Sequence, residues 1–380
     1  MPPSPVPRRG LYVLAALGML AGCNGGGDGD DTAPAETLRV ETQQVTSNGR
    51  GILEVDFEVQ EGERFQVVQS GDRNNGVYFT EELIDPDGNT VLTWEDWTGS
   101  EYSLTSAVYG AEFANTLNWP VREEDGPVAA GVWTLVGDTL DASYRQEADQ
   151  DVEVTIFYRK DLAEDVGTVH SIIAYCEGVR EDEEVVLGVE AAVAYWTELY
   201  ASWGITLTTE YADIAVDPSL PDTYLGVDEY KELLEQQVDY PLLMVIGEEI
   251  AGDAYIYGEA GGIPGPMLAT EISAVELSWL AHAGQNGKFS DEEVLLMGET
   301  MAHETGHFLG LFHPAEYPNW DYWDALDDTE ECTSYSDCED DLGDNLMFPY
   351  PVCTSIVDCL RQDRLSDQQV GILQRYVGVD

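Results

Sequence analysis

The sequence predicts an all-β region over residues 37–160, followed by a mixed α/β domain over residues 166–380. In the first region, apolar and acidic residues alternate along Leu53–Val59, as in a strand with one buried face. In the second, apolar residues recur three or four positions apart along Val185–Trp203, as on one face of a helix. The continuous apolar run Leu242–Ile246 is typical of a buried central strand.

The first 22 residues are predicted to be a lipoprotein signal peptide. Two arginines precede the apolar run Leu11–Leu20, which is too short to span a bilayer. The following Ala-Gly-Cys resembles the end of the bacterial lipobox, whose cysteine becomes the lipidated first residue of the mature protein. This resemblance implies export and a membrane anchor at Cys23, with the outer membrane or the cell surface as the destination. An ordinary signal peptide cleaved near Ala21 is the alternative, and residues 23–36 are predicted to form a Gly/Asp-rich tether.

The region 37–160 contains several further strand candidates and no stretch with helical periodicity, so we expect a β-sandwich-like domain. These candidates are Phe65–Val68, Val77–Phe79, Val132–Val136 and Val152–Tyr158. Four tryptophans in the region favour a buried core, with a carbohydrate or peptide platform as the alternative. They are Trp94, Trp97, Trp119 and Trp133.

The second domain begins with a predicted strand at Thr168–Tyr175. After the helix that Gly204 ends, a second strand is expected at Ile205–Thr209. Another helical segment is expected around Ala274–Ala283. Ser290 and Glu293 then have the spacing of a capping box, which predicts the start of a helix that extends to Leu309.

Three of the five histidines lie in one eleven-residue segment. His303 and His307 are four residues apart, so both imidazoles face the same side of a helix and can bind one metal ion. Glu304 lies beside that face, within reach of a water molecule on the metal. Gly310 can adopt the left-handed conformation that ends a helix, which lets His313 supply the third ligand. Three neutral imidazoles leave one position open, as in catalytic zinc sites.

This segment fits the pattern HExxHxxGxxH and therefore resembles the signature of the metzincin zinc peptidases. The resemblance covers about residues 166–380, is specific from Glu299 to Tyr350, and is greatest for the pappalysin-type branch. It implies a metzincin-like catalytic domain with a mixed sheet, an active-site helix and a methionine turn. It also implies hydrolysis of peptide bonds by a zinc-bound water that Glu304 activates as the general base.

The methionine turn of these peptidases lies beneath the zinc, and Met347 is the candidate for it in this chain. In several metzincins, a tyrosine two residues after this methionine stabilises the transition state. Here Pro349 occupies that position, and the neighbouring Tyr350 is the candidate for an oxyanion or substrate contact. No cysteine-switch propeptide is recognisable.

The formal net charge is −58, because 74 acidic residues face 16 basic ones. This charge excludes nucleic acid as a partner, since phosphate backbones are bound by Lys and Arg. Eleven carboxylates between Asp321 and Asp344 predict either a solvated acidic loop or a Ca²⁺ site. Beyond Cys23, the simplest pairing joins the two pairs of cysteines that are six residues apart and leaves Cys176 single. Those pairs are Cys332 with Cys338 and Cys353 with Cys359.

The leading hypothesis is therefore a zinc-dependent endopeptidase at the cell surface or in the periplasm, acting on proteins or peptides. The alternative is a surface binding or adhesion lipoprotein whose peptidase domain is weak or inactive. A structural zinc protein is a third hypothesis, which the absence of a fourth protein ligand in the motif disfavours. The sequence does not identify the substrate.

Overall fold

The computed structural model describes residues 38–71, 77–93, 96, 102–103, 114–141, 143–160, 167–222, 225–236, 242–283, 287–320, 322–355 and 358–380. The predicted signal peptide, Cys23 and the tether lie outside the described residues, as do Trp94 and Trp97. The described part belongs to one compact unit, Thr37–Asp380. No described helix is long and apolar enough to cross a membrane.

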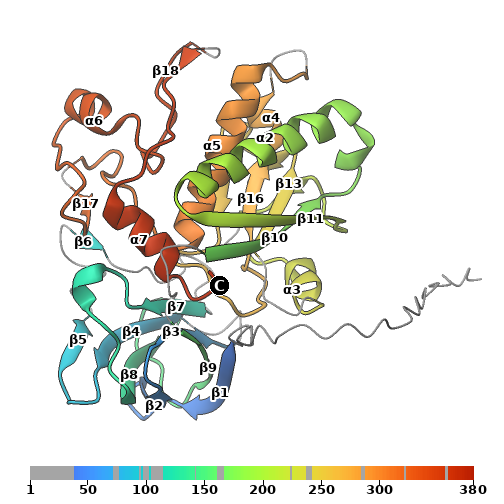
Figure 1. Ribbon diagram of the computed structural model, residues 1–380. Helices are drawn as coiled ribbons and strands as arrows, with labels where there is room; N and C mark the ends of the chain where they lie inside the picture. The colour runs from blue at the N-terminus through green and yellow to red at the C-terminus, as the bar shows by residue number, and fades with distance from the viewer. Residues whose placement is uncertain are drawn as a thin grey trace, which may run out of the picture. The chain divides into compact units, whose positions relative to one another are not determined.

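The first region, called the β-region below, comprises residues 39–160 and contains two four-stranded antiparallel sheets (Figure 1). The first sheet has the order β1 (Arg39–Thr46), β9 (Asp151–Lys160), β3 (Glu63–Ser70) and β7 (Ala114–Trp119). The second has the order β2 (Ile52–Val59), β8 (Gly131–Leu140), β4 (Val77–Ile84) and β5 (Thr90–Thr93). A short η1 helix (Glu123–Asp125) separates β7 from β8.

Aromatic side chains from both sheets meet in a common core. The ring of Phe65 on β3 lies 5.0 Å from that of Phe57 on β2 and 5.3 Å from that of Trp133 on β8. The alternation along Leu53–Val59 predicted which face of β2 is buried, and the burial of Leu53, Val55, Phe57 and Val59 confirms it. Trp119 and Trp133 are buried as well, which confirms the core interpretation for these two residues.

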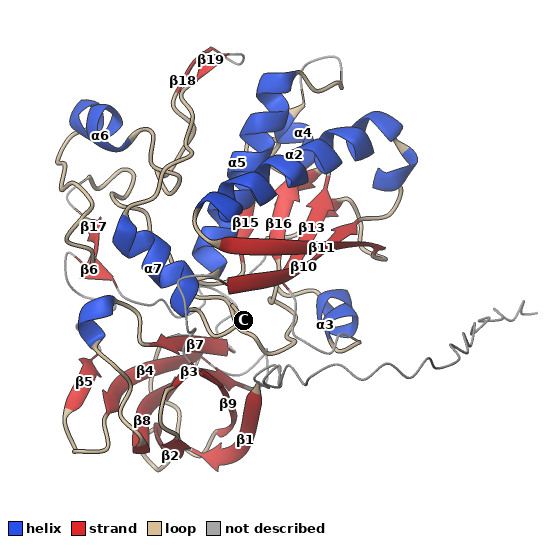
Figure 2. Ribbon diagram, viewed as in Figure 1, coloured by secondary structure: helices blue, strands red, loops and turns tan. Residues whose placement is uncertain are grey.

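The second region is built around a five-stranded sheet (Figure 2). Its order is β11 (Ile205–Asp213), β10 (Gly167–Tyr175), β13 (Leu242–Gly247), β16 (Val275–Ser278) and β15 (Gly258–Ala260). The neighbouring strands are parallel except for β15, which runs antiparallel to β16 at one edge. Every residue of the central β13 is buried, as its continuous apolar run predicts.

Two long helices, α2 (Glu183–Ser202) and α5 (Asp291–Phe308), pack against each other beside this sheet (Figure 1). The hydroxyl of Tyr200 on α2 donates a hydrogen bond of 3.1 Å to the carbonyl of Ala302 on α5. The buried residues of α2 include Val185, Val189, Val193 and Trp196, which confirms the predicted apolar face.

The remaining elements are short. They are β6 (Tyr102–Ser103), η2 (Val179–Glu181), β12 (Ser219–Leu220), α3 (Asp228–Leu234), β14 (Glu249–Ile250), α4 (Trp279–His282), β17 (Trp323–Asp324), α6 (Tyr335–Leu342), β18 (Cys353–Ser355), β19 (Asp358–Cys359) and α7 (Asp367–Arg375). Disulfides join Cys332 to Cys338 and Cys353 to Cys359, which confirms the predicted pairing. Cys176 is buried and has a free thiol. Disulfides are typical of an extracellular or periplasmic protein.

The prediction of one helical segment over Ala274–Ala283 is wrong. Val275–Ser278 forms the strand β16, which pairs with β13 on one side and with β15 on the other, and only Trp279–His282 is helical. A short apolar run has no period that distinguishes a buried strand from a buried helix. Its partners, which lie far away in the sequence, decide between the two.

Candidate metal centre

The helix α5 carries the first part of the site and begins at the predicted capping box. The hydroxyl of Ser290 accepts a hydrogen bond from the backbone N–H of Glu293, while the Glu293 carboxylate accepts one from the backbone N–H of Ser290. These bonds satisfy N–H groups that a helix start leaves without a partner. Most of the remaining helix is buried, from Leu296 to Phe308, so its histidines occupy fixed positions.

The chain turns sharply where α5 ends. Gly310 has a φ angle of +113°, a backbone conformation that side-chain-bearing residues rarely adopt. The N–H of Leu311 donates to the carbonyl of Gly306, and that of Gly310 to the carbonyl of His307. Gly310 thus has the helix-ending role that the sequence predicts. The turn returns the chain toward α5 and brings His313 to His303 and His307.

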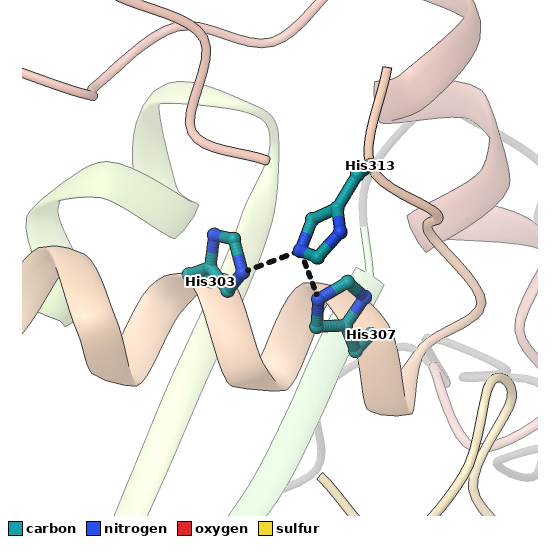
Figure 3. Close-up of side chains that lie close together, drawn as sticks. All are labelled: His303, His307 and His313. Carbon is teal, nitrogen blue, oxygen red and sulfur yellow. Dashed lines mark hydrogen bonds between the residues drawn. The ribbon is translucent and has the colours of Figure 1, made fainter. Parts of the chain in front are cut away.

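The three imidazoles point toward a common centre (Figure 3). Their Nε2 atoms are separated by 3.0 Å between His307 and His313, and by 3.3 Å between His313 and His303. Tetrahedral zinc with Zn–N bonds of 2.0–2.1 Å places two of its ligand atoms about 3.3 Å apart. The donor set and its spacing therefore fit a zinc ion held by three histidines.

Backbone carbonyls fix the orientation of the two helical ligands. The Nδ1 atom of His303 lies 2.6 Å from the carbonyl oxygen of Leu346, and that of His307 lies 2.7 Å from the carbonyl oxygen of Leu311. Because Nδ1–H donates in each bond, Nε2 carries a lone pair toward the metal position. These two partners could not be predicted from residue types, since every residue has a carbonyl.

A carboxylate orients the third ligand. The Nδ1 atom of His313 lies 3.1 Å from a carboxylate oxygen of Glu316. Such a carboxylate–histidine pair fixes the ring and increases the basicity of the ligand nitrogen. Glu316 follows His313 by only three residues, so an acidic residue next to the motif was the signal that could have identified it.

The two helical histidines are held in the form that binds a metal. Burial, with charge repulsion from His313 as a smaller cause, lowers the pKa of His303 to about 3. Burial and the two neighbouring imidazoles also lower the pKa of His307 well below its ordinary value. Both rings are therefore neutral at pH 7, as metal ligation requires.

Glu304 follows His303 in α5, and both residues line a pocket that is described below. Burial, and to a lesser extent the charge of Glu259, raises the pKa of Glu304 to about 8. A cation held by the histidines would lower this pKa again, because an opposite charge nearby favours the ionised carboxylate. The strand β15 approaches closely here: a Cβ atom on Gly258 would lie 2.6 Å from Cγ of Glu304.

Met347 is fully buried under the helix, close to the ligands. A Cβ atom on Gly306 would lie 2.6 Å from its Sδ atom, so the turn around Met347 packs directly against α5. Tyr350 follows this turn and stacks on Tyr335 with ring centroids 6.1 Å apart. Burial raises the pKa of Tyr350, so its hydroxyl stays protonated at neutral pH.

A pocket of about 290 Å³ opens beside His303 and Glu304. One wall belongs to α5, a second to the turn that contains Met347, and a third to the segment before β15. The pocket is lined by Tyr255, Tyr257, Gly258, Leu296, Glu299, Thr300, His303, Glu304, Leu346, Phe348, Pro349, Tyr350, Pro351 and Gln362. Burial raises the pKa of Glu299 in its wall to about 7, although Arg361 lies 3.4 Å away. Glu299 was not among the site residues that the sequence predicted.

The acidic segment gives no second metal cluster among the described residues, where the three histidines form the one group suited to a metal ion. Asp321 lies outside the described residues. Asp324 is buried and accepts hydrogen bonds from the hydroxyl of Thr329 and the N–H of Leu326. Burial raises the pKa of Asp324 to about 7. The calcium interpretation thus gains no support.

No model of a protein family matches the chain, and no curated protein matches it. Among solved structures, an archaemetzincin from Methanopyrus kandleri is similar with a TM-score of 0.33 and 14% identity, over 55% of this chain and 95% of that one. Metalloproteinase-II from Bacteroides fragilis is similar with a TM-score of 0.32 and 13% identity, over 60% and 63% of the two chains. A periplasmic inhibitor of g-type lysozyme from Aeromonas hydrophila is similar with a TM-score of 0.19 and 12% identity, over 34% and 92%. Likenesses this low do not assign the chain to a family.

Proposed function

We propose that this chain is a zinc-dependent endopeptidase that cleaves proteins or peptides outside the cytoplasm. The observation that carries the proposal is the convergence of three imidazoles beside an acidic residue at an open pocket. His303, His307 and His313 would hold the ion, with Nδ1 of each ring fixed by its own partner. The position that the protein leaves open is typical of a catalytic zinc and not of a structural one.

The protein's own residues would divide the work as follows. A zinc ion bound at this site would act as a Lewis acid and would make water a better nucleophile at neutral pH. Glu304 accepts the proton of the attacking water and then delivers it to the leaving amine, as its place at the pocket wall allows. The protonated hydroxyl of Tyr350 donates a hydrogen bond to the oxygen of the scissile carbonyl as negative charge develops there.

The pocket would receive one side chain of the substrate. It opens next to Glu304 and has largely apolar and aromatic walls. Such walls favour the binding of a peptide that inserts one side chain between α5 and the turn. Because Met347 packs on Gly306 from below, the depth of the pocket and the position of the histidines depend on the same turn.

The first test is Glu304→Gln, which removes the base and keeps the size of the side chain. We expect zinc content and melting temperature to stay near those of the wild type, while cleavage of a peptide library falls by at least 100-fold. Zinc-loaded wild-type protein that releases no peptide from the library would reject the peptidase and favour the surface binding protein.

A second test addresses the metal. His303→Ala should abolish stoichiometric zinc binding, because it removes one of three ligands. His170→Ala is the matched control, since His170 is a half-exposed histidine that bonds to Thr208 and lies on β10 outside the site. Equal zinc content in the two variants would contradict the proposed ligand set.

The cellular location completes the proposal. We infer that the mature protein starts at Cys23 and is anchored by lipid, which fits the disulfides of an oxidising compartment. Wild-type protein expressed in a Gram-negative host should partition into detergent, whereas Cys23→Ala should stay in the aqueous phase. An unmodified wild-type protein cleaved near Ala21 would favour the ordinary signal peptide.

A further inference from the structure

The β-region binds the C-terminal end of the chain through buried polar side chains. Arg64 on β3 donates hydrogen bonds to the carbonyls of Gln374 and Val379. Asn118 on β7 donates to the carbonyl of Arg375 at 3.1 Å and accepts from the N–H of Val377 at 3.0 Å. Arg64 and Asn118 are only 2% and 7% exposed, so these bonds are shielded from water.

These contacts complete the end of a helix. Gln374 and Arg375 are the last residues of α7, and the final carbonyls of a helix have no partner within it. The β-region supplies the missing donors, and the positive charge of Arg64 is favourable at the negative end of the helix dipole. The β-region therefore holds α7 in place.

The other end of α7 holds the turn beneath the metal site. Gln369 lies in the first turn of α7, and its side-chain oxygen accepts a hydrogen bond of 2.8 Å from the side-chain NH₂ group of Asn345. The side-chain NH₂ group of Gln369 donates one of 3.3 Å to the side-chain oxygen of Asn345. The same Asn345 oxygen accepts from the N–H of Met347 at 2.8 Å. Between these two residues lies Leu346, whose carbonyl orients His303.

A second path leads from the β-region to the end of α5. Gln66 on β3 is completely buried, donates to the carbonyl of Gly265 and accepts from the N–H of Met267. The N–H of Gly265 in turn donates to the carbonyl of Phe308, the last residue of α5. This contact lies two residues before the Gly310 turn that brings in His313.

We propose that the β-region is a built-in support of the metal centre, with Asn118 and Gln369 as positioning residues that act through Leu346 on His303. On this proposal the β-region belongs to the metal-binding unit and is not an independent adhesion module. This inference rests on the proposed zinc site, because its effect is on how the chain binds the ion.

The experiment compares Asn118→Ala with Asn115→Ala in the full chain. Both asparagines are buried on β7 and each makes two side-chain hydrogen bonds, but Asn115 bonds within the β-region, to Gln69 and Thr80. The Zn²⁺ affinity is measured by competition with a chromogenic chelator, and the melting temperature of the metal-free protein by circular dichroism. We expect Asn118→Ala to weaken Zn²⁺ binding about tenfold, and Asn115→Ala to change it less than twofold at a similar loss of melting temperature.

Equal zinc affinities in these two variants, with a wild type that binds zinc, would overturn the inference and leave the peptidase proposal intact. A wild type that binds no zinc would overturn both. If Asn118→Ala fails to fold, the zinc affinities of two Gln369 variants test the inference. Gln369→Glu keeps the acceptor for the amide of Asn345 and should stay within about threefold of the wild type, whereas Gln369→Leu should lose about tenfold. Equal affinities of these two Gln369 variants would also reject the inference.

Discussion

Gly310→Ala should separate the strain of the turn from the packing around it. A Cβ atom on Gly310 would lie 3.4 Å from Cγ2 of Ile372 and 3.8 Å from Cβ of Pro264, both ordinary contact distances. The cost of the methyl group therefore comes from the backbone, since φ is +113°. Holding a residue other than glycine in such a conformation costs about 1–3 kcal/mol.

This strain should appear in the zinc affinity. The metal-free variant can relax its turn and move His313 away, whereas the zinc-bound variant must restore the strained conformation. Because part of the zinc-binding free energy is used to restore this conformation, we expect the zinc affinity to fall by roughly 5- to 150-fold, the equivalent of 1–3 kcal/mol. The assay is chelator competition on purified protein, with urea unfolding of the metal-free form as the companion measurement.

Gly62→Ala is the matched control. Gly62 has a φ of +76° in a turn of the β-region, and nothing lies within 4 Å of its added Cβ. We expect a comparable loss of unfolding free energy in Gly62→Ala and an unchanged zinc affinity. Zinc binding by Gly310→Ala at wild-type strength would refute the role of Gly310 in placing His313.

Three further outcomes are expected. Burial lowers the pKa of His282 to about 4. The free energy of unfolding should therefore fall by up to about 3 kcal/mol as pH drops from about 6.5 to about 4, because only the unfolded chain takes up the proton in this range. Urea titrations check this, and the pH profile of His282→Gln should be flatter than that of the wild type. Tyr350→Phe should lower kcat by about 10- to 100-fold at unchanged zinc content, because it removes only the hydroxyl and keeps the ring stacked on Tyr335; unaltered kcat would reduce Tyr350 to a packing role. The melting temperature should be the same in calcium and in a chelator that spares zinc, since the described carboxylates form no cluster; a rise of several degrees in calcium would restore the predicted Ca²⁺ site.

Local signals in the sequence were sufficient for the elements that a single segment determines. The capping box at Ser290, the four-residue spacing of two histidines and the glycine at 310 all act within a few residues of each other. The same holds for β13, whose apolar run shows its burial on both faces. The disulfides belong here too, since each joins cysteines only six residues apart.

Elements that depend on distant partners were not predictable in this way. β15 and β16 are strands because they pair with each other and with β13, although Gly258–Ala260 lies in a stretch rich in glycine and proline. The hydrogen-bond partner of His303 could not be predicted for a similar reason, because the Leu346 carbonyl is 43 residues away from it in the sequence. The helix α7 did have an unused local signal, the spacing of Ser366 and Gln369 in a capping box.

The metal ligands and their supports thus come from different parts of the chain for a physical reason. A short motif can place two histidines on a helix, but the angle of each ring depends on a partner for its other nitrogen. The His303 partner belongs to a turn held by Asn345 and Gln369, and the helix that carries Gln369 ends on the β-region. On this proposal, a histidine motif of eleven residues depends on order over several hundred residues, and we expect a change at Asn118 to weaken zinc binding without any change in the motif.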